Sequence, residues 1–153
     1  MKKANWAMGR QRLLFLAAVL DIADKGHELV DERTYNQNTF VHPCGAPACA
    51  LGHYAAQFPR RFRLKAPGGD SLLGAVVPTD AAPYSEEYTR GIGTHNLRTL
   101  GEFAISMAES DELFAADGCG RAKKAVDAAA YIRKFVARKD RKLRAAKAKR
   151  KAR

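Results

Sequence analysis

The sequence lacks a long hydrophobic run. Its most apolar stretch, Leu13–Leu20, has eight residues, whereas a membrane-spanning helix needs roughly 18. Arg10 and Arg12 lie before this stretch, Asp21 follows it, and the small-residue cleavage site of a signal peptide is missing. We therefore expect neither a membrane segment nor a secretory leader, and we expect the protein to be cytoplasmic.

Cysteine is also scarce. The chain has three cysteines, Cys44, Cys49 and Cys119, an odd number that is not typical of the disulfide framework of a small secreted domain. Free thiols or a metal site fit this number better.

Several motifs that define large enzyme classes are absent. The sequence contains no P-loop, no glycine fingerprint for a dinucleotide and no H-E-x-x-H metalloprotease motif. The alternating oxygen ligands of a calcium loop are missing as well. No catalytic residues are predicted, and the sequence favours a non-enzymatic protein without deciding the question.

What the sequence does contain indicates one domain with a tail. With 153 residues, 46% of them hydrophobic, the chain can bury a core without disulfides or a metal. We predict an α+β fold, mostly helical, with about five helices around one core and a small β-hairpin at about residues 60–78. Residues 1–138 form the domain, and residues 139–153 form a basic tail that is disordered or a frayed helix.

Apolar spacing and capping signals locate the helices. A capping box of Ser106 and Glu109 begins one of them, Tyr35 and Phe40 anchor a polar segment in the core, and residues 117–120 form a tight turn. The predicted helices cover about 10–25, 47–57, two turns from residue 96, 106–114, and a last helix from residue 121. Their predicted core positions are Leu13, Leu16, Ala17 and Leu20; Leu97, Leu100, Phe103 and Ala104; and Ala125, Ala128, Ala129, Ile132 and Val136.

Positive charge is concentrated at the C-terminus. The net charge is +11; residues 139–153 hold nine cations and one acid, Asp140, so they carry +8 and the other 138 residues only +3. Such a segment binds phosphates by counterion release without reading sequence, and its lack of aromatic residues argues against base stacking. The alternative is a solubilising tail. The predicted nucleic-acid-binding residues are Lys139, Arg141, Lys142, Arg144, Lys147, Lys149, Arg150, Lys151 and Arg153.

The densest group of reactive side chains contains His42, Cys44, Cys49 and His53. Cys49 and His53 lie one helical turn apart on one face, and the other two could complete a tetrahedral zinc site. The spacing is not one of the strong zinc patterns, so a buried structural cysteine and a locally hydrogen-bonded histidine are the alternative. A thiol nucleophile activated by a helix N-terminus is a third hypothesis.

Residues 44–53, Cys-Gly-Ala-Pro-Ala-Cys-Ala-Leu-Gly-His, resemble a CGTxxCAxGHA signature of small bacterial proteins, some of them associated with phages or prophages. The segment from Ser106 to Gly120 and the helix Ala129–Val136 look similar too. The resemblance covers most of residues 10–137 and implies one helical domain in a bacterial setting, with no assigned activity. Ala46 departs from the signature, which often has threonine there.

Together these observations favour a small accessory or interaction protein whose basic tail binds nucleic acid or another polyanion non-specifically. One alternative is a Cys/His-centred domain, stabilised by zinc or acting as a thiol-dependent enzyme. Another is a structural helical domain that binds a protein partner.

Overall fold

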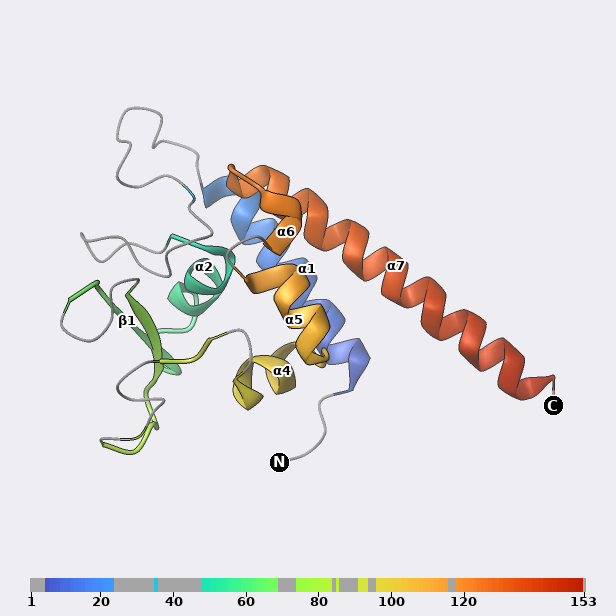
Figure 1. The fold of residues 1–153 in the computed structure, drawn as a ribbon, viewed down its shortest axis with the longest axis horizontal. Coiled ribbons are helices and arrows are strands. Elements are labelled where there is room, and N and C mark those ends of the chain that lie inside the picture. The colour runs from blue at the N-terminus through green and yellow to red at the C-terminus, as the bar shows by residue number, and fades with distance from the viewer. Residues whose placement is uncertain are drawn as a thin grey trace.

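The computed structural model describes residues 5–23, 35, 48–68, 74–83, 85, 91–93, 96–115 and 118–152. This part contains five α-helices of seven or more residues, one four-residue helix and a two-stranded sheet, so the predicted mostly helical α+β class is confirmed (Figure 1). No described helix is long and apolar enough to span a membrane. The elements are α1 (Trp6–Ala23), α2 (Ala50–Ala56), β1 (Phe62–Lys65), β2 (Ala75–Pro78), α4 (Leu97–Phe103), α5 (Met107–Phe114), α6 (Gly118–Arg121) and α7 (Ala125–Lys151).

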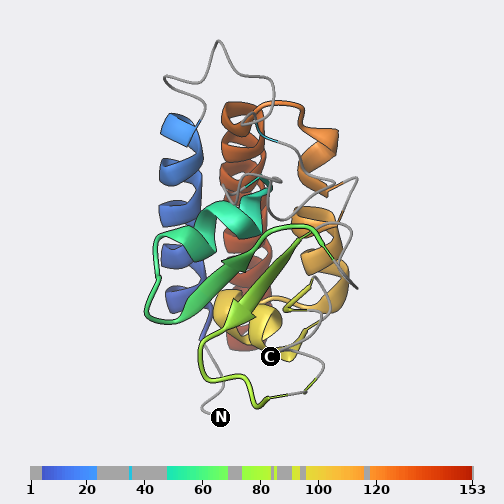
Figure 2. The same cartoon turned by 90° about the vertical axis from the view of Figure 1, so that its left-hand side faces the viewer.

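Helices α1 and α7 lie side by side, with α7 along one edge of the molecule (Figures 1 and 2). Each presents an apolar stripe at helical spacing to the core, and Arg133 of α7 donates a hydrogen bond to the Asp21 carboxylate of α1. The predicted core positions of both helices are confirmed, as is that of Phe135, which the sequence places beside the stripe of the last helix. The buried residues of this pair include Leu13, Leu16, Ala17 and Leu20 of α1 and Ala125, Ala128, Ala129, Ile132, Phe135 and Val136 of α7.

The hairpin and α2 cover one side of the α1–α7 pair (Figure 2). β1 and β2 pair antiparallel, with Phe62 opposite Pro78 and Lys65 opposite Ala75, so the predicted hairpin is confirmed. Helix α2 begins at Ala50, inside the predicted range, and its small residues Ala50, Gly52 and Ala55 are buried and allow close packing. The predicted anchor Tyr35 is also buried, while Phe40 lies outside the described residues.

Gly9 determines how closely α1 approaches α4. A Cβ atom at this position would lie 2.0 Å from the backbone carbonyl oxygen of Phe103. Because neither backbone can move without disturbing its own helix, only glycine fits here. This contact brings the C-terminal end of α4 against the N-terminal half of α1.

The connection from α4 to α7 agrees with the sequence in part. The capping box is confirmed: Glu109 N–H donates to Ser106 Oγ at 3.3 Å, and Ser106 N–H donates to Glu109 Oε2 at 2.9 Å. Leu97, expected in the core, is 74% exposed instead, because α4 buries Thr99 and Phe103. Residues 118–121 form α6 rather than a simple turn, with Cys119 at a φ of 50°.

Helix α7 begins at Ala125, later than predicted, and continues to Lys151 without a break. The sequence predicts disorder or fraying after residue 138, because Leu143 is the only large apolar residue there. The helix persists in a composition of alanine, lysine, arginine and leucine, which are the residues with the best intrinsic helix propensities. The tail is therefore a helical extension of the core helix (Figure 1).

Candidate functional site

The point at which α7 leaves the body is held by Asp140. The indole Nε1–H of Trp6 donates to Asp140 Oδ1 at 2.7 Å, and Arg10 Nε donates to Oδ2 at 2.8 Å. The hydrogen bonds from Arg10 and Trp6 lower the pKa of Asp140, so this carboxylate is charged at neutral pH. The first turns of α1 thus hold α7 by hydrogen bonds at the end of the segment that packs against the body.

Lys139 secures the same point from the other side. Its Nζ donates to Glu109 Oε2 at 2.6 Å and to the carbonyl oxygen of Ala104 at 3.2 Å, and it lies 4.6 Å from the ring centroid of Trp6. Burial alone would raise the pKa of Glu109, but the hydrogen bond from Lys139 and those with Ser106 outweigh it and lower that pKa. Lys139 is one of the predicted nucleic-acid-binding residues, and its ammonium group is engaged with the body.

Every residue from Arg141 to Ala152 is exposed, including Leu143, which is 45% exposed. This segment, which we call the projecting helix, holds seven cations and no acidic residue, and it stands clear of the other elements (Figure 1). Its cations are Arg141, Lys142, Arg144, Lys147, Lys149, Arg150 and Lys151. Arg153, the last predicted contact, lies outside the described residues.

The structure describes two of the four predicted metal ligands, Cys49 and His53; His42 and Cys44 lie outside the described residues. Cys49 is the N-cap of α2 and its carbonyl oxygen accepts a hydrogen bond from the His53 N–H at 2.9 Å. The His53 ring stacks on Tyr35, with centroids 6.4 Å apart. Within the described ranges no three potential ligands form a metal-binding group, and the four-residue zinc site stays a prediction.

Burial suppresses the acidity of the two described thiols. It raises the pKa of Cys49 to about 11 and that of Cys119 to about 12. The hydrogen bonds that Cys49 receives at the start of α2 act in the opposite direction and are outweighed. The Cys119 thiol donates to the carbonyl oxygen of Leu113 at 3.1 Å. Both groups are therefore thiols, not thiolates, at neutral pH, and thiols are weak nucleophiles.

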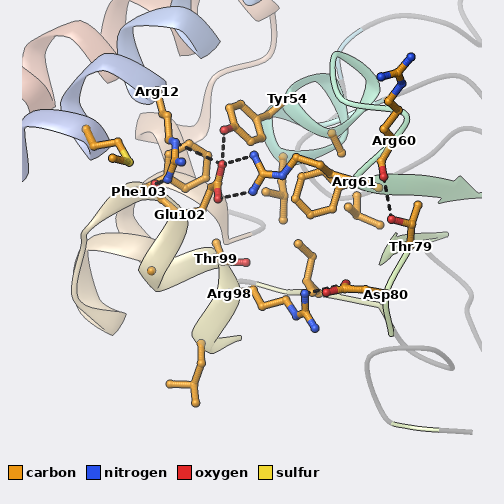
Figure 3. A pocket seen from close by; sticks show the side chains of 18 of the residues that line it. Arg12, Tyr54, Arg60, Arg61, Thr79, Asp80, Arg98, Thr99, Glu102 and Phe103 are labelled. Atoms are coloured by element: carbon orange, nitrogen blue, oxygen red, sulfur yellow. Dashed lines mark hydrogen bonds and ion pairs between the residues drawn. The ribbon is translucent and has the colours of Figure 1, made fainter. Parts of the chain in front are cut away.

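A cleft of about 1050 Å³ opens between α1, α2, the hairpin and α4 (Figure 3). Leu51, Val76 and Ile92 are among the apolar residues that line it. Four arginines and two acids also line it: Arg12, Arg60, Arg61, Arg98, Asp80 and Glu102. No local sequence motif predicts this cleft.

Glu102 lies at the centre of the charged network in the cleft (Figure 3). Arg61 Nη1 and Nη2 donate to its two carboxylate oxygens at 2.9 and 2.7 Å, and the Tyr54 hydroxyl donates to Oε1 at 2.5 Å. Arg12 Nη1 donates to the Glu102 carbonyl oxygen at 2.8 Å, and its Nε lies 3.4 Å from Oε1. One carboxylate thus joins α1, α2, α4 and the residue before β1.

These contacts determine the protonation states in the cleft. Burial alone would raise the pKa of Glu102, but the hydrogen bonds from Arg61 and Tyr54 and the charges of Arg61 and Arg12 lower it. Burial and the bond to Glu102 raise the pKa of Tyr54 well above its ordinary value. At neutral pH the network holds a fixed carboxylate and a fixed phenol, which is suited to joining helices and not to proton transfer.

Another ion pair of the cleft, between Arg98 and Asp80, lies at its rim. Arg98 Nη1 is 2.8 Å from Asp80 Oδ1, and the Asp80 side chain is 72% exposed. The hydrogen bond from Arg98 lowers the pKa of Asp80. Nearby, the Thr79 hydroxyl donates to the carbonyl oxygen of Arg60 at 2.8 Å and closes the base of the hairpin. Because the pair at the rim is solvated, it contributes little to holding the fold together.

Comparison of this chain with protein-family models, with curated proteins and with solved structures finds no match.

Proposed function

We propose that this protein is a small accessory protein that binds nucleic acid non-specifically through the projecting helix. One observation carries the proposal: from Arg141 to Ala152 the chain is an exposed helix with seven cations and no acid. A segment that serves only to extend a helical core does not need cations to be concentrated in it and acidic residues to be excluded from it.

The chemistry of the projecting helix suits phosphate groups. Lysine and arginine side chains that neutralise phosphates release condensed counterions, and this release supplies most of the free energy of non-specific binding. The segment has no asparagine, glutamine or aromatic residue, so it lacks the amide side chains that read adenine and the rings that stack on bases. The affinity therefore depends on salt and only weakly on sequence.

The body of the protein fixes the position of the first residues before this helix. Lys139 forms an ion pair with Glu109, and Asp140 accepts hydrogen bonds from Arg10 and Trp6. The helix therefore leaves the body at a defined place. Such a protein would act in the cytoplasm of a bacterial cell, as expected from the sequence, where nucleic acid is accessible.

The test compares two triple variants that lose the same charge. The first is Lys147→Gln/Lys149→Gln/Lys151→Gln in the projecting helix. The second is Lys123→Gln/Lys124→Gln/Lys134→Gln, which replaces exposed lysines of the body. Binding to fluorescently labelled DNA and RNA is measured by anisotropy over a series of salt concentrations.

We expect the wild-type affinity to fall linearly on a plot of log K against log salt concentration. The slope of the first variant is expected to be shallower by up to about 2.7, at roughly 0.9 for each lost phosphate contact, and that of the second to be unchanged. The absence of any binding at low salt would refute the proposal, as would equal losses in the two variants, since binding would then follow total charge.

A further inference from the structure

We infer that the nucleic acid that the projecting helix recognises is duplex DNA, and that the helix lies in the major groove. This inference rests on the proposed function and specifies its ligand. Three observations support it: the distribution of charge around the helix, its dimensions and its lack of aromatic residues.

The cations surround the projecting helix instead of lining one face. At about 100° per residue, Lys147, Arg144 and Arg141 point to one half of the circumference, and Lys142, Lys149 and Arg150 to the other. No gap between neighbouring cations is wider than about 80° on this projection. A helix on the outside of a strand could use only one side of this distribution, whereas a helix in a groove has phosphates of both strands beside it.

The dimensions agree with the major groove. A helix with its side chains is about 10–12 Å wide, and the major groove of B-DNA is about 12 Å wide and admits a helix. Ala145, Ala146 and Ala148 keep the helix narrow between its cations. The twelve residues from Arg141 to Ala152 span about 18 Å, which corresponds to about half a turn of B-DNA.

The same features disfavour the other nucleic acids. The major groove of A-form RNA is deep and narrow and does not accept side chains on a helix. Single strands are bound mainly by base stacking on aromatic rings, and residues 141–153 contain none. Duplex DNA is thus the ligand that an all-round basic helix without aromatic residues fits best.

Binding should also stabilise the helix. Like charges lie three or four residues apart at 141–144, 144–147, 147–150 and 147–151, and such pairs destabilise an exposed helix. Phosphates on both sides of the groove neutralise this repulsion. We therefore expect the helical signal of the protein to increase on addition of duplex DNA.

The test uses the full chain and breaks the helix without changing its charge. Ala146→Pro breaks the projecting helix in its middle, since proline in a helix interior costs about 3 kcal/mol, and leaves every charge in place. Ala152→Pro is the matched control, because Ala152 is the C-cap of α7 and its substitution removes only the last bond, from its N–H to Ala148 O. Each protein is titrated with a duplex DNA of about 16 base pairs, which exceeds one helical turn, with the corresponding RNA duplex and with one DNA strand. Circular dichroism in the far ultraviolet follows helicity.

We expect the wild type and Ala152→Pro to bind duplex DNA at least about tenfold more tightly than the RNA duplex or the single strand, with a gain of helicity. Ala146→Pro should lose this preference and keep only the weaker binding common to all three. Equal affinity of the wild type for the three ligands, or an unchanged preference in Ala146→Pro, would overturn the inference and leave the proposed function in place. No binding to any of them would refute the proposed function itself.

Discussion

Replacement of Glu102 by glutamine tests whether one carboxylate joins the elements around the cleft. Glutamine has the shape of glutamate, but it has no charge and has only one acceptor oxygen. The carboxylate now accepts two hydrogen bonds from Arg61 and one from Tyr54 and faces Arg12. In Glu102→Gln the amide NH₂ group must face a guanidinium donor, so at least one of these bonds is lost.

The size of the expected loss in stability follows from the exposed fractions of the side chains. The Glu102 side chain is 12% exposed, but those of Arg61 and Arg12 are 46% and 28% exposed, so water can solvate both guanidinium groups again after the change. Hydrogen bonds to charged groups contribute about 1.5–3 kcal/mol, and solvation of the arginines reduces this. We expect a loss of about 2 kcal/mol in the free energy of unfolding, or a decrease of about 4–8 °C in Tm for a chain of this size.

Chemical denaturation at neutral pH measures this loss. Asp80→Asn is the matched control, because it makes the same change of acid to amide in the exposed pair at the rim of the cleft, and we expect its unfolding midpoint to equal that of the wild type. Equal midpoints for Glu102→Gln and the wild type would refute the reasoning. So would equal losses in the two variants, since burial would then not distinguish the two pairs.

The pH dependence gives the same prediction a second test. The folded-state pKa of Glu102 lies below its ordinary value of 4.5, so its contribution to stability is present above pH 4.5 and is lost as the pH falls through the folded-state value. The difference in stability between the wild type and Glu102→Gln should therefore be constant near neutral pH and should decrease below pH 4.5. A difference that grows on acidification would contradict the assigned protonation state.

Three further predictions concern the fold. Gly9→Ala places a Cβ atom 2.0 Å from a backbone oxygen of α4 and should lower the unfolding midpoint strongly or abolish folding. Gly93→Ala is the control: no atom lies within 4 Å of the added Cβ, so the midpoint should be nearly unchanged. Similar midpoints for the two variants would refute the close packing of α1 on α4. Ser106→Ala removes the N-cap of α5 and should cost about 1 kcal/mol in denaturant unfolding. Cys49 and Cys119, whose pKa values are raised to about 11 and about 12, should stay unmodified by a thiol reagent at neutral pH in the folded protein and react after denaturation, as peptide mass spectrometry would report; rapid labelling of either in the folded state would contradict their burial.

The features that could be predicted are those encoded by neighbouring residues. The stripe of Leu13, Leu16 and Leu20 recurs at helical spacing, and the capping box of Ser106 and Glu109 lies within four residues; both are confirmed. Local spacing suffices here because a helix brings residues three and four apart to one face whatever packs against it.

The charged network of the cleft could not be predicted. Arg12, Tyr54, Arg61 and Glu102 come from four separate parts of the chain, with up to 90 residues between Arg12 and Glu102, and none belongs to a local motif. The acidity of Cys49 was unpredictable for a similar reason. Its position at a helix N-terminus suggests a lowered pKa, but the opposing effect of burial depends on what the rest of the chain places around it.

The sequence by itself determined most of the helices, the hairpin and the concentration of positive charge in residues 139–153, since each of these depends on residues close together in the chain. Only the tertiary structure decided which of those charges face solvent. Lys139 lies 30 residues from Glu109, and Asp140 lies 134 from Trp6, yet these contacts hold the two residues against the body, while Arg141 and the residues that follow project from it. The physical reason is that the energy of an ion pair depends on distance in space and on burial, and the fold sets both.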